Sequence, residues 1–453
     1  MMSHRIYNAL VAAAVAATVA PSAAIGSAPA SYVPGEVVIG YSPQAKLGSI
    51  ARGLRLSVNG SPTPGVELLR LPADESVPAA VARLRSVRGV SYAVPDYIAH
   101  IAGSFIPNDP GRAGSAAGWE RMQWNLLPSA GVNAPSAWAN LIADHRPGGQ
   151  GVVVAVLDTG VAYRDWGQFA RSPDFTGTRF VAPYDFVAGN SYPLDREGHG
   201  TFVAGEIAEA TNNHFGLTGL AYGSTIMPVR VLAADGTGDA ATIARGIRYA
   251  VAHRARVINL SLEFGIDIEP ADIPEIINAV AFAHRRGVLV VGASGNDQAQ
   301  QIAYPARAPG AVAVGATTRD RCLGWYSNVG PSLALVAPGG NDDASLVSDP
   351  NCHPARSLPS IYQLTFSDPS NLRRFGYPND YYGTSMAAAE VSATAALVIA
   401  SGVIGSHPTP DQVLTRLEQT AAHLSGAAWP NENYGYGLVD AGAATAPLIS
   451  GSS

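Results

Sequence analysis

Three side chains, widely spaced along the chain, have the chemistry of a nucleophile and its activating groups. Asp158 stands in AVLDTG, His199 in EGHGTFVAGEIA and Ser385 in YGTSMAAAEV, in that chain order and 41 and 186 positions apart. A serine hydroxyl is a weak nucleophile until a base takes its proton, and a carboxylate can hold the imidazole base in the right tautomer. Asn296, in VVGASGND, carries an amide that can donate to an oxyanion. Together these residues predict nucleophilic acyl transfer.

Each of these residues also has an ordinary structural explanation. Ser385 precedes the helix-forming run at residues 386–389, and serine is a common N-cap. Asp158 before Thr-Gly is a frequent turn former, and Asn296 stands in a plain Gly-Asn turn. His199, between two glycines at the start of a helix, could cap or pack. The catalytic interpretation therefore depends on a fold that brings all four together.

The elements that must position these residues follow an alternating pattern. Runs of β-branched and small apolar residues, typical of strands buried in a parallel sheet, occur at residues 151–160, 224–232, 255–262, 287–294 and 311–316. Amphipathic helical stretches at 241–254 and 274–287 separate some of them. This alternation predicts an α/β fold with a doubly wound, mostly parallel sheet flanked by helices, whose ligands bind at the carboxyl ends of the strands. Asp158 stands at such an end.

The N-terminal part of the chain has a different character. An apolar segment of 12 residues at 9–20 follows a basic residue and precedes small residues, which predicts a secretory signal peptide. It is too short to span a bilayer. From 33 to 102 the order strand, helix (43–54), strand, helix, strand predicts a small α+β unit. Residues 103–118, rich in Gly, Pro and Ser, predict an exposed linker.

Composition excludes several classes of protein. The formal net charge is −6 and the basic residues are scattered, so no nucleic-acid partner is expected. Only 14% of residues are charged, and the 48 Gly and 33 Pro favour a compact fold with many tight turns over disorder. The apolar run at 391–405 contains Ser, Thr and Gly, which predicts a buried core helix. We find neither a GxSxG elbow nor an HExxH zinc signature.

The chain has two cysteines, Cys322 and Cys352, 30 positions apart. In an exported protein an even count permits a disulfide, with two buried thiols as the alternative. A disulfide would pin the acidic loop at residues 339–351. The carboxylates of that loop are most simply a solvated face, and calcium binding is the other interpretation.

The motifs around the candidate residues resemble those of the subtilisin family of serine proteases. The similar segments are VAVLDTG, GHGTFVAGEIA, VINLSL, GASGN and GTSMAA, supported by IMPVRVL, VAPGG and the closing YGYGLVDAGAA. The resemblance covers residues 123–444 and implies that the four residues act as orienting acid, general base, nucleophile and oxyanion donor. Residues 33–102 resemble the inhibitory propeptide of the same family, which implies a ferredoxin-like fold for them.

The resemblance also implies a cleft in which an extended peptide pairs as a strand with the backbone of residues 261–263. The implied substrate-binding residues are Ser261, Leu262, Glu263, Ala293, Ser294, Gly295 and Ala303. The small ones leave room for medium or large apolar side chains, although they could also be plain strand-end turns. The family has Gly where this chain has Glu263, which predicts a carboxylate beside the cleft and a preference for a basic substrate residue. The family also has Pro-His where this chain has Ala389-Glu390, and we expect altered packing there with activity retained.

The stretch EATNNHFGLTGLA matches the calcium loop of the family in length. The resemblance implies a structural calcium ion, and the ligands carried over are the side chains of Asp174 and Asn213 and the carbonyls of Thr211, Phe215 and Leu217. Calcium prefers such oxygen ligands. An ordinary Asn-Asn surface turn explains the stretch equally well, and the chemistry itself is expected to need no cofactor.

The sequence therefore predicts a secreted or periplasmic serine endopeptidase that acts through an acyl-enzyme and is made as a self-processed precursor. The expected divisions are a signal peptide at 1–30, an inhibitory and folding-assisting propeptide at 31–102, a linker and processing region at 103–118, a catalytic domain at 119–446 and a tail at 447–453. Its expected partners are protein or peptide substrates and its own propeptide, without nucleic acid or a membrane span, and the expected state is a monomer. Two alternatives stay open: a catalytically silent binding protein, and an acyl-transfer enzyme or peptide ligase on the same scaffold.

Overall fold

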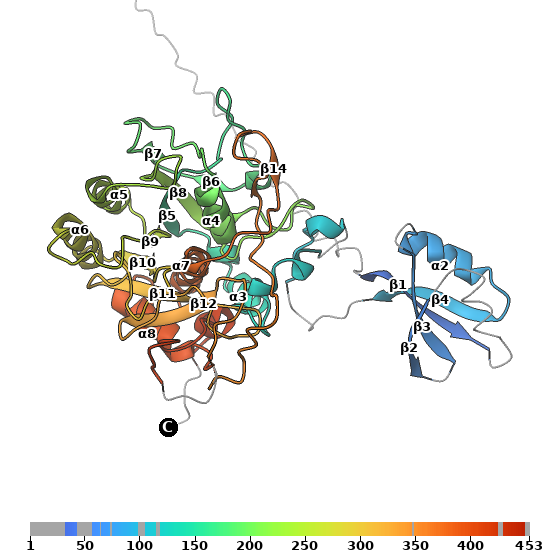
Figure 1. Ribbon diagram of the computed structural model, residues 1–453. Helices are drawn as coiled ribbons and strands as arrows, with labels where there is room; N and C mark the ends of the chain where they lie inside the picture. Colours follow the sequence, from blue (N-terminus) through green and yellow to red (C-terminus); the bar gives the residue numbers. More distant parts are fainter. Residues whose placement is uncertain are drawn as a thin grey trace, which may run out of the picture.

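The computed structural model describes residues 32–42, 57–63, 65–72, 75–97, 105–114, 118–346, 348–424 and 429–448. These residues form a small N-terminal unit and a large α/β domain (Figure 1). The predicted signal peptide at 1–30 and the expected helix at 43–54 lie outside the described residues, so both stay predictions.

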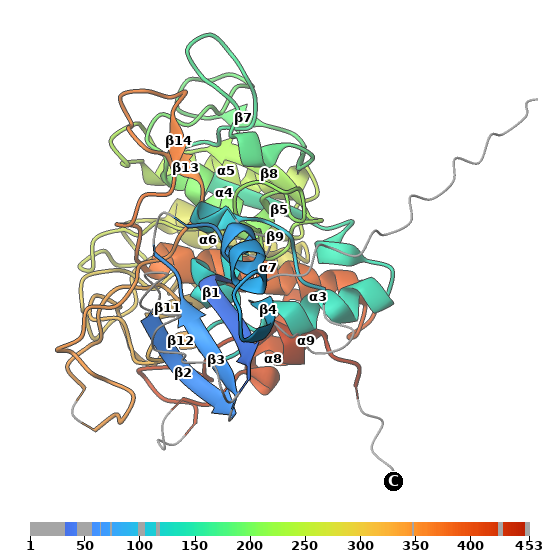
Figure 2. The same cartoon turned by 90° about the vertical axis from the view of Figure 1, so that its right-hand side faces the viewer.

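The N-terminal unit is an antiparallel sheet with a helix on one face (Figure 2). Its elements are β1 (Tyr32–Tyr41), β2 (Ser57–Thr63), β3 (Val66–Arg70), α2 (Val77–Arg85) and β4 (Val90–Tyr97). The strand order is β2-β3-β1-β4, as in a ferredoxin-like sheet. Ile39 and Leu69 on the strands pack against Leu84 on the helix and are fully buried. The α+β prediction is thus confirmed, but β2 was not anticipated because SVNGSPT has no apolar alternation.

The large domain is built on an eight-stranded sheet in which every pairing is parallel. Its strands are β5 (Val153–Asp158), β6 (Arg179–Phe180), β7 (Tyr184–Asp185), β8 (Thr225–Arg230), β9 (Val257–Leu260), β10 (Leu289–Ala293), β11 (Ala311–Thr317) and β12 (Leu333–Pro338). The order is β12-β11-β10-β9-β5-β8-β6, with β7 also paired to β8. All five strands expected from the apolar runs are present, and the fold prediction is confirmed.

Helices cover both faces of this sheet (Figure 1). One face carries α5 (Ala240–Ala252) and α6 (Pro274–Arg285). The other carries α3 (Ala134–Ala143), α4 (His199–Ala208), α7 (Thr384–Ser401), α8 (Pro410–Thr420) and α9 (Ala441–Thr445). Strand β5 shows why both layers are needed: Val154 and Val156 join the core under α7, whereas Ala155 and Leu157 join the core under α5 and α6. Successive side chains of a strand point to opposite faces, and here both faces are apolar.

Helix α7 runs through the middle of the domain and carries the predicted nucleophile near its start. Its 18 residues are long and apolar enough to cross a membrane by length and composition, but 89% of them are buried inside the protein. It packs against α4 and against strands β9 to β12. The expected core helix is therefore confirmed.

Short 3₁₀ helices and a two-stranded ribbon complete the domain. They are η1 (Gly111–Ala113), η2 (Gly118–Arg121), η3 (Trp124–Leu126), η4 (Pro147–Gly149), η5 (Pro173–Phe175), β13 (Thr365–Phe366) and β14 (Phe375–Gly376).

Residues 105–113, which we call the strap, correct the prediction of an exposed linker. Asp109 has no exposed surface, the indole N–H of Trp119 donates to the carbonyl of Pro107 at 3.0 Å, and the Phe105 ring packs edge-on against Trp138. The Gly, Pro and Ser content suggested a linker, but the Phe-Ile-Pro start of the segment supplies apolar surface that the domain buries.

The structure joins Cys322 to Cys352, with their Cα atoms 4.9 Å apart. The disulfide pins the acidic loop that follows β12, as the sequence suggested. The prediction of a solvated acidic face is wrong for Asp343 and Asp349, which are 3% and 7% exposed. Their carboxylates accept hydrogen bonds from side-chain hydroxyls and hold the loop against the domain.

Candidate active site

Asp158 and His199 meet at the carboxyl edge of the sheet. Asp158 is the last residue of β5 and has no exposed surface, and His199 is the first residue of α4. His199 Nδ1 lies 2.8 Å from Asp158 Oδ1 and 3.0 Å from Oδ2. The backbone N–H of Thr159 also donates to Oδ1 at 2.7 Å. The carboxylate is thus fixed, and it fixes Nδ1 as the protonated nitrogen of a neutral imidazole, leaving Nε2 free to act as a base.

The turn before His199 is held by two acidic residues that the sequence analysis did not single out. The carboxylate of Asp195 accepts the backbone N–H groups of Glu197, Gly198 and Thr201. The carboxylate of Glu197 accepts the N–H of His199 at 2.6 Å. Gly198 has φ +119°, which favours glycine. The acidic residues in DREGHG were the available sequence signal, because carboxylates commonly accept the free N–H groups at a helix start.

The electrostatics of this corner favour a proton on the imidazole. Burial lowers the pKa of His199, but the facing Asp158 carboxylate outweighs burial, and Glu197 adds to its effect. Together they raise the pKa of His199 to about 9. A group that takes a proton from a hydroxyl and later returns it benefits from such stabilisation of its charged form.

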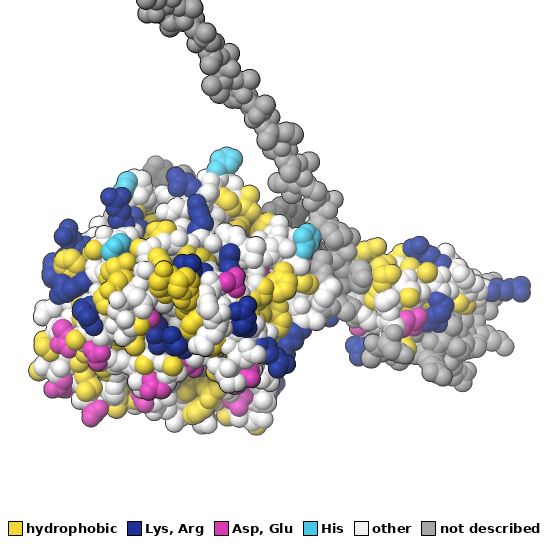
Figure 3. Space-filling view, turned by 90° about the horizontal axis from the view of Figure 1, so that it is seen from above, with side chains coloured by type: hydrophobic (Ala, Val, Ile, Leu, Met, Phe, Trp, Pro, Cys, Tyr) yellow, Lys and Arg dark blue, Asp and Glu magenta, His cyan; other side chains and the backbone are white. Residues whose placement is uncertain are grey.

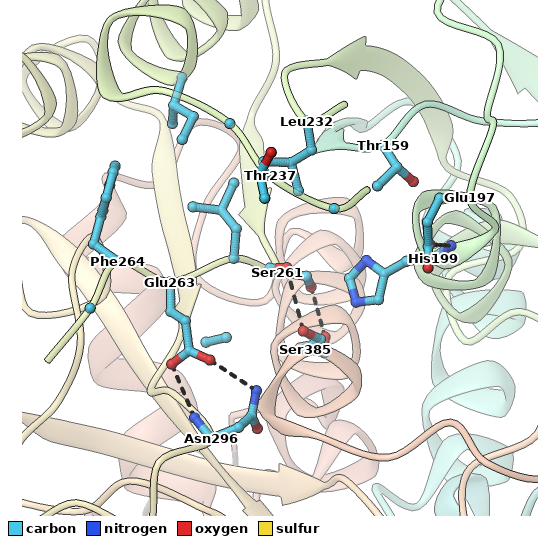
Figure 4. A pocket seen from close by; sticks show the side chains of 16 residues that line it. Thr159, Glu197, His199, Leu232, Thr237, Ser261, Glu263, Phe264, Asn296 and Ser385 are labelled. Carbon is cyan, nitrogen blue, oxygen red and sulfur yellow. Dashed lines mark hydrogen bonds between the residues drawn. The ribbon is translucent and has the colours of Figure 1, made fainter. Parts of the chain in front are cut away.

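Ser385 is the second residue of α7, and Gly383, rather than the serine, occupies the N-cap position. The serine is therefore not an N-cap, and its hydroxyl remains available for chemistry. Ser385 Oγ lies 3.4 Å from the carbonyl oxygen of Ser261, a weak contact, and Figure 4 shows the His199 ring beside it. The start of α7 adds the positive end of a helix dipole close to the hydroxyl.

A buried polar network ties the start of α7 to the sheet. The hydroxyl of Ser261, just after β9, donates to the carbonyl of Ser385 at 2.7 Å, and Asn259 Nδ2 donates to that hydroxyl at 2.9 Å. Ser392, two turns along α7, donates to Asn259 Oδ1 at 2.8 Å. The candidate nucleophile is thus positioned by a rigid strand and helix, as a catalytic geometry requires.

Asn296, after β10, has its amide oriented by α7. Its Oδ1 accepts the N–H of Thr384 at 2.9 Å and the hydroxyl of Thr384 at 3.1 Å. With the oxygen held in this way, Nδ2 faces Glu263 (Figure 4). Nδ2 donates to Glu263 Oε1 at 3.4 Å, which is a weak hydrogen bond, and its second hydrogen is free for an oxyanion.

These side chains line one open cavity of about 480 Å³. Figure 4 shows His199, Ser385, Asn296 and Glu263 around it. The residues that line it are Thr159, Glu197, His199, Leu232, Gly236, Thr237, Gly238, Ile243, Ser261, Leu262, Glu263, Phe264, Gly265, Ala293, Asn296 and Ser385. Four of the predicted substrate-binding residues are among them, together with the loop at 232–238, which sequence reasoning missed.

The other predicted substrate-binding residues lie behind the cavity wall. Ser294 is fully buried, and its hydroxyl donates to the carbonyl of Asn328 at 3.0 Å. The N–H of Ala303 donates to the carbonyl of Ser294 at 2.8 Å. Gly295 lies next to Glu263, because a Cβ added to it would be 2.4 Å from Glu263 Oε2. Ser294 and Ala303 therefore support the wall rather than line the cavity.

A second group of carboxylates gathers around the predicted calcium loop. Asp109, Asp174 and Glu209 are all fully buried. Both carboxylate oxygens of Glu209 lack a hydrogen-bond partner in the described part of the chain. Burial raises the pKa of Asp109 to about 6 and that of Asp174 to about 8, and burial and the other two carboxylates raise the pKa of Glu209.

Two of the predicted ligand residues, Asn213 and Leu217, contact the Asp174 carboxylate. Asn213 Nδ2 and the N–H of Leu217 donate to Asp174 at 2.8 and 2.9 Å, and the N–H of Phe215 donates to Asn213 Oδ1. Asp109 and Glu209 were not predicted, because the sequence does not reveal that both side chains are buried here. Three buried acids with two orphaned oxygens fit a hard cation such as calcium.

Asp320, Asp343 and His353, beside the disulfide, also place ligand atoms within 4.8 Å of one another. Asp320 Oδ2 already pairs with Arg356 at 3.0 Å and with His353 at 3.2 Å. The Arg356 guanidinium offsets the charge of Asp320, so we interpret the group as a structural cluster.

Comparisons with known proteins agree with this geometry. The model of the subtilase family matches residues 149–437, and a model of the fervidolysin N-terminal prodomain matches residues 18–96. Subtilisin BL of Lederbergia lenta is 36% identical over 316 residues, which cover 69% of this chain and 96% of that protein. The thermophilic serine proteinase of Bacillus sp. (strain AK1) is 30% identical over 400 residues, or 87% of this chain and 84% of its own.

A solved structure, of proteases from Pseudoalteromonas arctica PAMC 21717, is similar with a TM-score of 0.58 and 28% identity. The likeness covers 75% of this chain and 99% of that one. The family match spans the candidate acid, base, oxyanion donor and nucleophile, and the prodomain match spans most of the small N-terminal unit. The chain therefore belongs to the subtilase family and is a serine endopeptidase with an N-terminal prodomain.

Proposed function

We propose that this enzyme is a secreted endopeptidase that hydrolyses peptide bonds through an acyl-enzyme on Ser385 and that processes its own precursor. The observation that carries the proposal is the hydrogen-bonded pair of Asp158 and His199 beside Ser385 and Asn296 in one cavity. A carboxylate, an imidazole, a hydroxyl and an amide in this order are the groups that acyl transfer needs.

In the first half-reaction the Ser385 hydroxyl turns from the Ser261 carbonyl towards His199. Its proton passes to His199 Nε2 as its oxygen bonds to the substrate carbonyl carbon, and the carbonyl electrons move to an oxyanion. Asn296 Nδ2 donates to that oxyanion, and Asp158 stabilises the imidazolium. The carbon–nitrogen bond then breaks, His199 gives its proton to the leaving amine, and an ester on Ser385 remains.

Water completes the cycle by the same route in reverse. His199 takes a proton from the water as its oxygen attacks the ester, and a second oxyanion forms at Asn296. Its collapse breaks the bond to the serine oxygen, which regains the proton from His199. One peptide and one water are thus converted to a carboxylic acid and an amine, with the enzyme unchanged.

The test is mass spectrometry of the purified precursor without its predicted signal peptide, for wild type and Ser385→Ala in parallel. We expect wild type to release an N-terminal fragment and the variant to stay whole. If both stay whole, and wild type freed of its propeptide by an added protease cleaves no peptide, the silent-binding alternative replaces the proposal. If both are cut alike, another protease matures the enzyme and self-processing is wrong.

The strap narrows the expected processing site. Phe105, Pro107 and Asp109 are packed into the catalytic domain, so a cut after them would remove buried contacts. We therefore place the cut before Phe105, at the upstream edge of the region expected from sequence. The mass of the released fragment measures this directly.

We further propose a structural calcium ion at Asp109, Asp174 and Glu209. Calcium would supply the positive charge that three buried carboxylates otherwise lack, and the carbonyls of the loop at 210–217 would complete its oxygen ligands. The ion would join the strap to that loop and take no part in the bond-breaking steps.

Export from the cytoplasm is proposed from the apolar segment at 9–20 and from the disulfide, which persists in oxidising compartments. The proposed partners are protein or peptide substrates and the prodomain, and the proposed state is a monomer. On the face seen in Figure 3, basic side chains are interspersed with hydrophobic and uncharged ones and do not cover it. This distribution supports a peptide partner over a nucleic acid.

A further inference from the structure

Glu263 follows β9 and reaches across the cavity to the opposite wall (Figure 4). Its Oε2 accepts the backbone N–H of Asn296 at 3.0 Å, and its Oε1 accepts Asn296 Nδ2 at 3.4 Å. The side chain thus spans from the strand expected to pair with substrate backbone to the wall formed by Ala293 and Asn296. The carbonyl of the substrate residue before the scissile bond must reach Asn296 Nδ2, which also donates to this carboxylate, so we expect the side chain of that residue to enter beside Glu263.

Among the described residues, the cavity lining offers Glu263 no positively charged partner, because the one histidine of the lining, His199, faces Asp158. The lining contains two carboxylates, Glu197 and Glu263, and neither Lys nor Arg. Partial burial raises the pKa of Glu263, the Asn296 N–H groups lower it, and the nearby Asp297 carboxylate raises it again. No cation of the described residues acts on it. A concave site with uncompensated negative charge attracts a cationic ligand and concentrates it.

From this arrangement we propose that Glu263 makes the enzyme selective for Lys or Arg immediately before the scissile bond, and that pairing with this cation offsets the carboxylate charge beside the oxyanion held by Asn296. The inference rests on the proposed endopeptidase function and names its substrate class. The aliphatic stem of such a residue would pass along Leu262 and Ala293, which line the same cavity, while its charged end meets the carboxylate.

Because Glu263 contacts Asn296, the selectivity should affect the rate of the chemical step as well as substrate binding. Thr384 fixes the amide oxygen, so Glu263 and the oxyanion draw on the two hydrogens of the same Nδ2. A negative carboxylate beside the oxyanion also opposes its charge. A substrate cation neutralises the carboxylate and weakens its hold on the amide. Basic substrates should therefore show a higher kcat as well as a lower KM, because neutralising the carboxylate stabilises the enzyme most when the oxyanion forms.

The experiment compares four peptides that differ only in the residue before the scissile bond: Arg, Lys, Gln or Met. The enzymes are mature wild type, Glu263→Gln, Glu263→Ala and the control Glu269→Gln, an exposed carboxylate outside the cavity. We expect the ratio of kcat/KM for Arg over Gln to fall about tenfold or more in both Glu263 variants, with part of the loss in kcat. The control should keep the wild-type ratio.

Measurable cleavage of the Met peptide by the Glu263 variants would show that they are folded and that their loss is selective for the basic peptides. An Arg-to-Gln ratio within twofold of wild type in both variants overturns the inference but leaves the endopeptidase in place. A wild type that cleaves none of the peptides or any other peptide overturns the proposed function, and this inference with it.

Discussion

Glu197 influences the pKa of His199 through its charge and through a hydrogen bond to the backbone, and it has no hydrogen bond with the ring nitrogen Nε2 among the described residues. Its carboxylate accepts the backbone N–H of His199, and its charge contributes to the raised pKa of the imidazole. The neutral imidazole is the base, so the raised pKa places the acid limb of the activity profile at higher pH than for an ordinary histidine. Activity is therefore expected to rise with pH into the alkaline range.

Glu197→Gln should move that limb to lower pH. Removing the negative charge takes away one cause of the raised pKa, so more of His199 is neutral at a given acidic pH. The measurement is kcat/KM against pH for one good peptide, with Glu269→Gln as the control that should not move. A limb that stays in place would mean that Glu197 serves only to hold the helix start.

Asp158→Asn tests the orienting acid. The amide can accept the Nδ1 proton only weakly and offers a donor of its own, so the imidazole loses its correct tautomer. We expect kcat to fall about 10⁴-fold, with KM nearly unchanged. Single-turnover kinetics with an ester substrate would separate this loss from weaker binding. A loss below about tenfold would contradict the assigned role.

Glu390, on the helix behind the nucleophile, forms a buried acid pair with Glu206 on α4. Both are almost fully buried, Asn125 Nδ2 donates to Glu390 Oε1 at 2.5 Å, and the oxygens of Glu206 have no partner among the described residues. Burial raises both pKa values well above normal, and the Glu390 charge adds to the effect on Glu206. The altered packing that we expected here from the sequence is a pair of carboxyl groups that favours the protonated form.

The pair predicts a specific pH dependence of stability. A folded-state pKa above the unfolded one means that the folded protein holds the proton more tightly, so stability is lost as pH rises from about 4 towards the folded pKa. One such group contributes a slope of about 1.4 kcal/mol per pH unit. Glu206→Gln should therefore flatten the fall of Tm as the pH rises above about 5. An unchanged slope would show that the pair does not titrate there.

At the scale of elements, the disulfide closes a segment of the chain that contains β12 and the acidic loop after it. Cys322→Ser with Cys352→Ser should lower the free energy of unfolding by about 3 to 4 kcal/mol, on the chain-entropy estimate for a loop of this length. Urea unfolding of the double variant made inactive by Ser385→Ala measures this without self-digestion. Reduction of the parent protein should give the same loss, and a parent unaffected by reductant would argue against the bond.

The strap and the loop at 209–217 should respond together to calcium. Removing the ion with a chelator should lower Tm, and more at pH 8 than at pH 5, because ligand carboxyls must lose their protons to bind. A free calcium concentration of one hundred times Kd would raise the free energy of unfolding by about 2.7 kcal/mol. Asp109→Asn should abolish most of the response, and Asp235→Asn, an exposed acid elsewhere, should not. An identical melting curve in chelator would exclude the site.

The elements that the sequence predicted well are those with a repeated apolar pattern. The buried strands β5 and β8 to β11 could be predicted because runs of β-branched residues are typical of such strands. Helix α7 could be predicted because its small apolar residues are typical of a core helix. The buried strap and strand β2 could not be predicted. Their composition is that of turns, and their structure depends on tertiary packing.

At the scale of the whole molecule, the four catalytic candidates could be predicted because their surrounding motifs are distinctive. Asp109 and Glu209 could not be predicted, since they acquire their roles only through burial and through contacts with segments distant in sequence, whereas the acidic stretch before His199 was an available signal for Glu197. Glu263 shows both cases. Its presence beside the cleft was expected from sequence, whereas its hold on Asn296 required the folded positions of β9 and β10.

The strap also affects how well the enzyme resists digestion by other molecules of the same protease. Protease molecules digest one another most readily where a chain end is loose, and the proposed processing would create a new end just before Phe105. Asp109, by accepting the N–H groups of Asn212 and Asn213, ties that end into the domain. The working lifetime should then follow the local opening of this strap rather than global unfolding. A few residues just after the cleavage site would thus set the rate of autolysis in a solution of the enzyme.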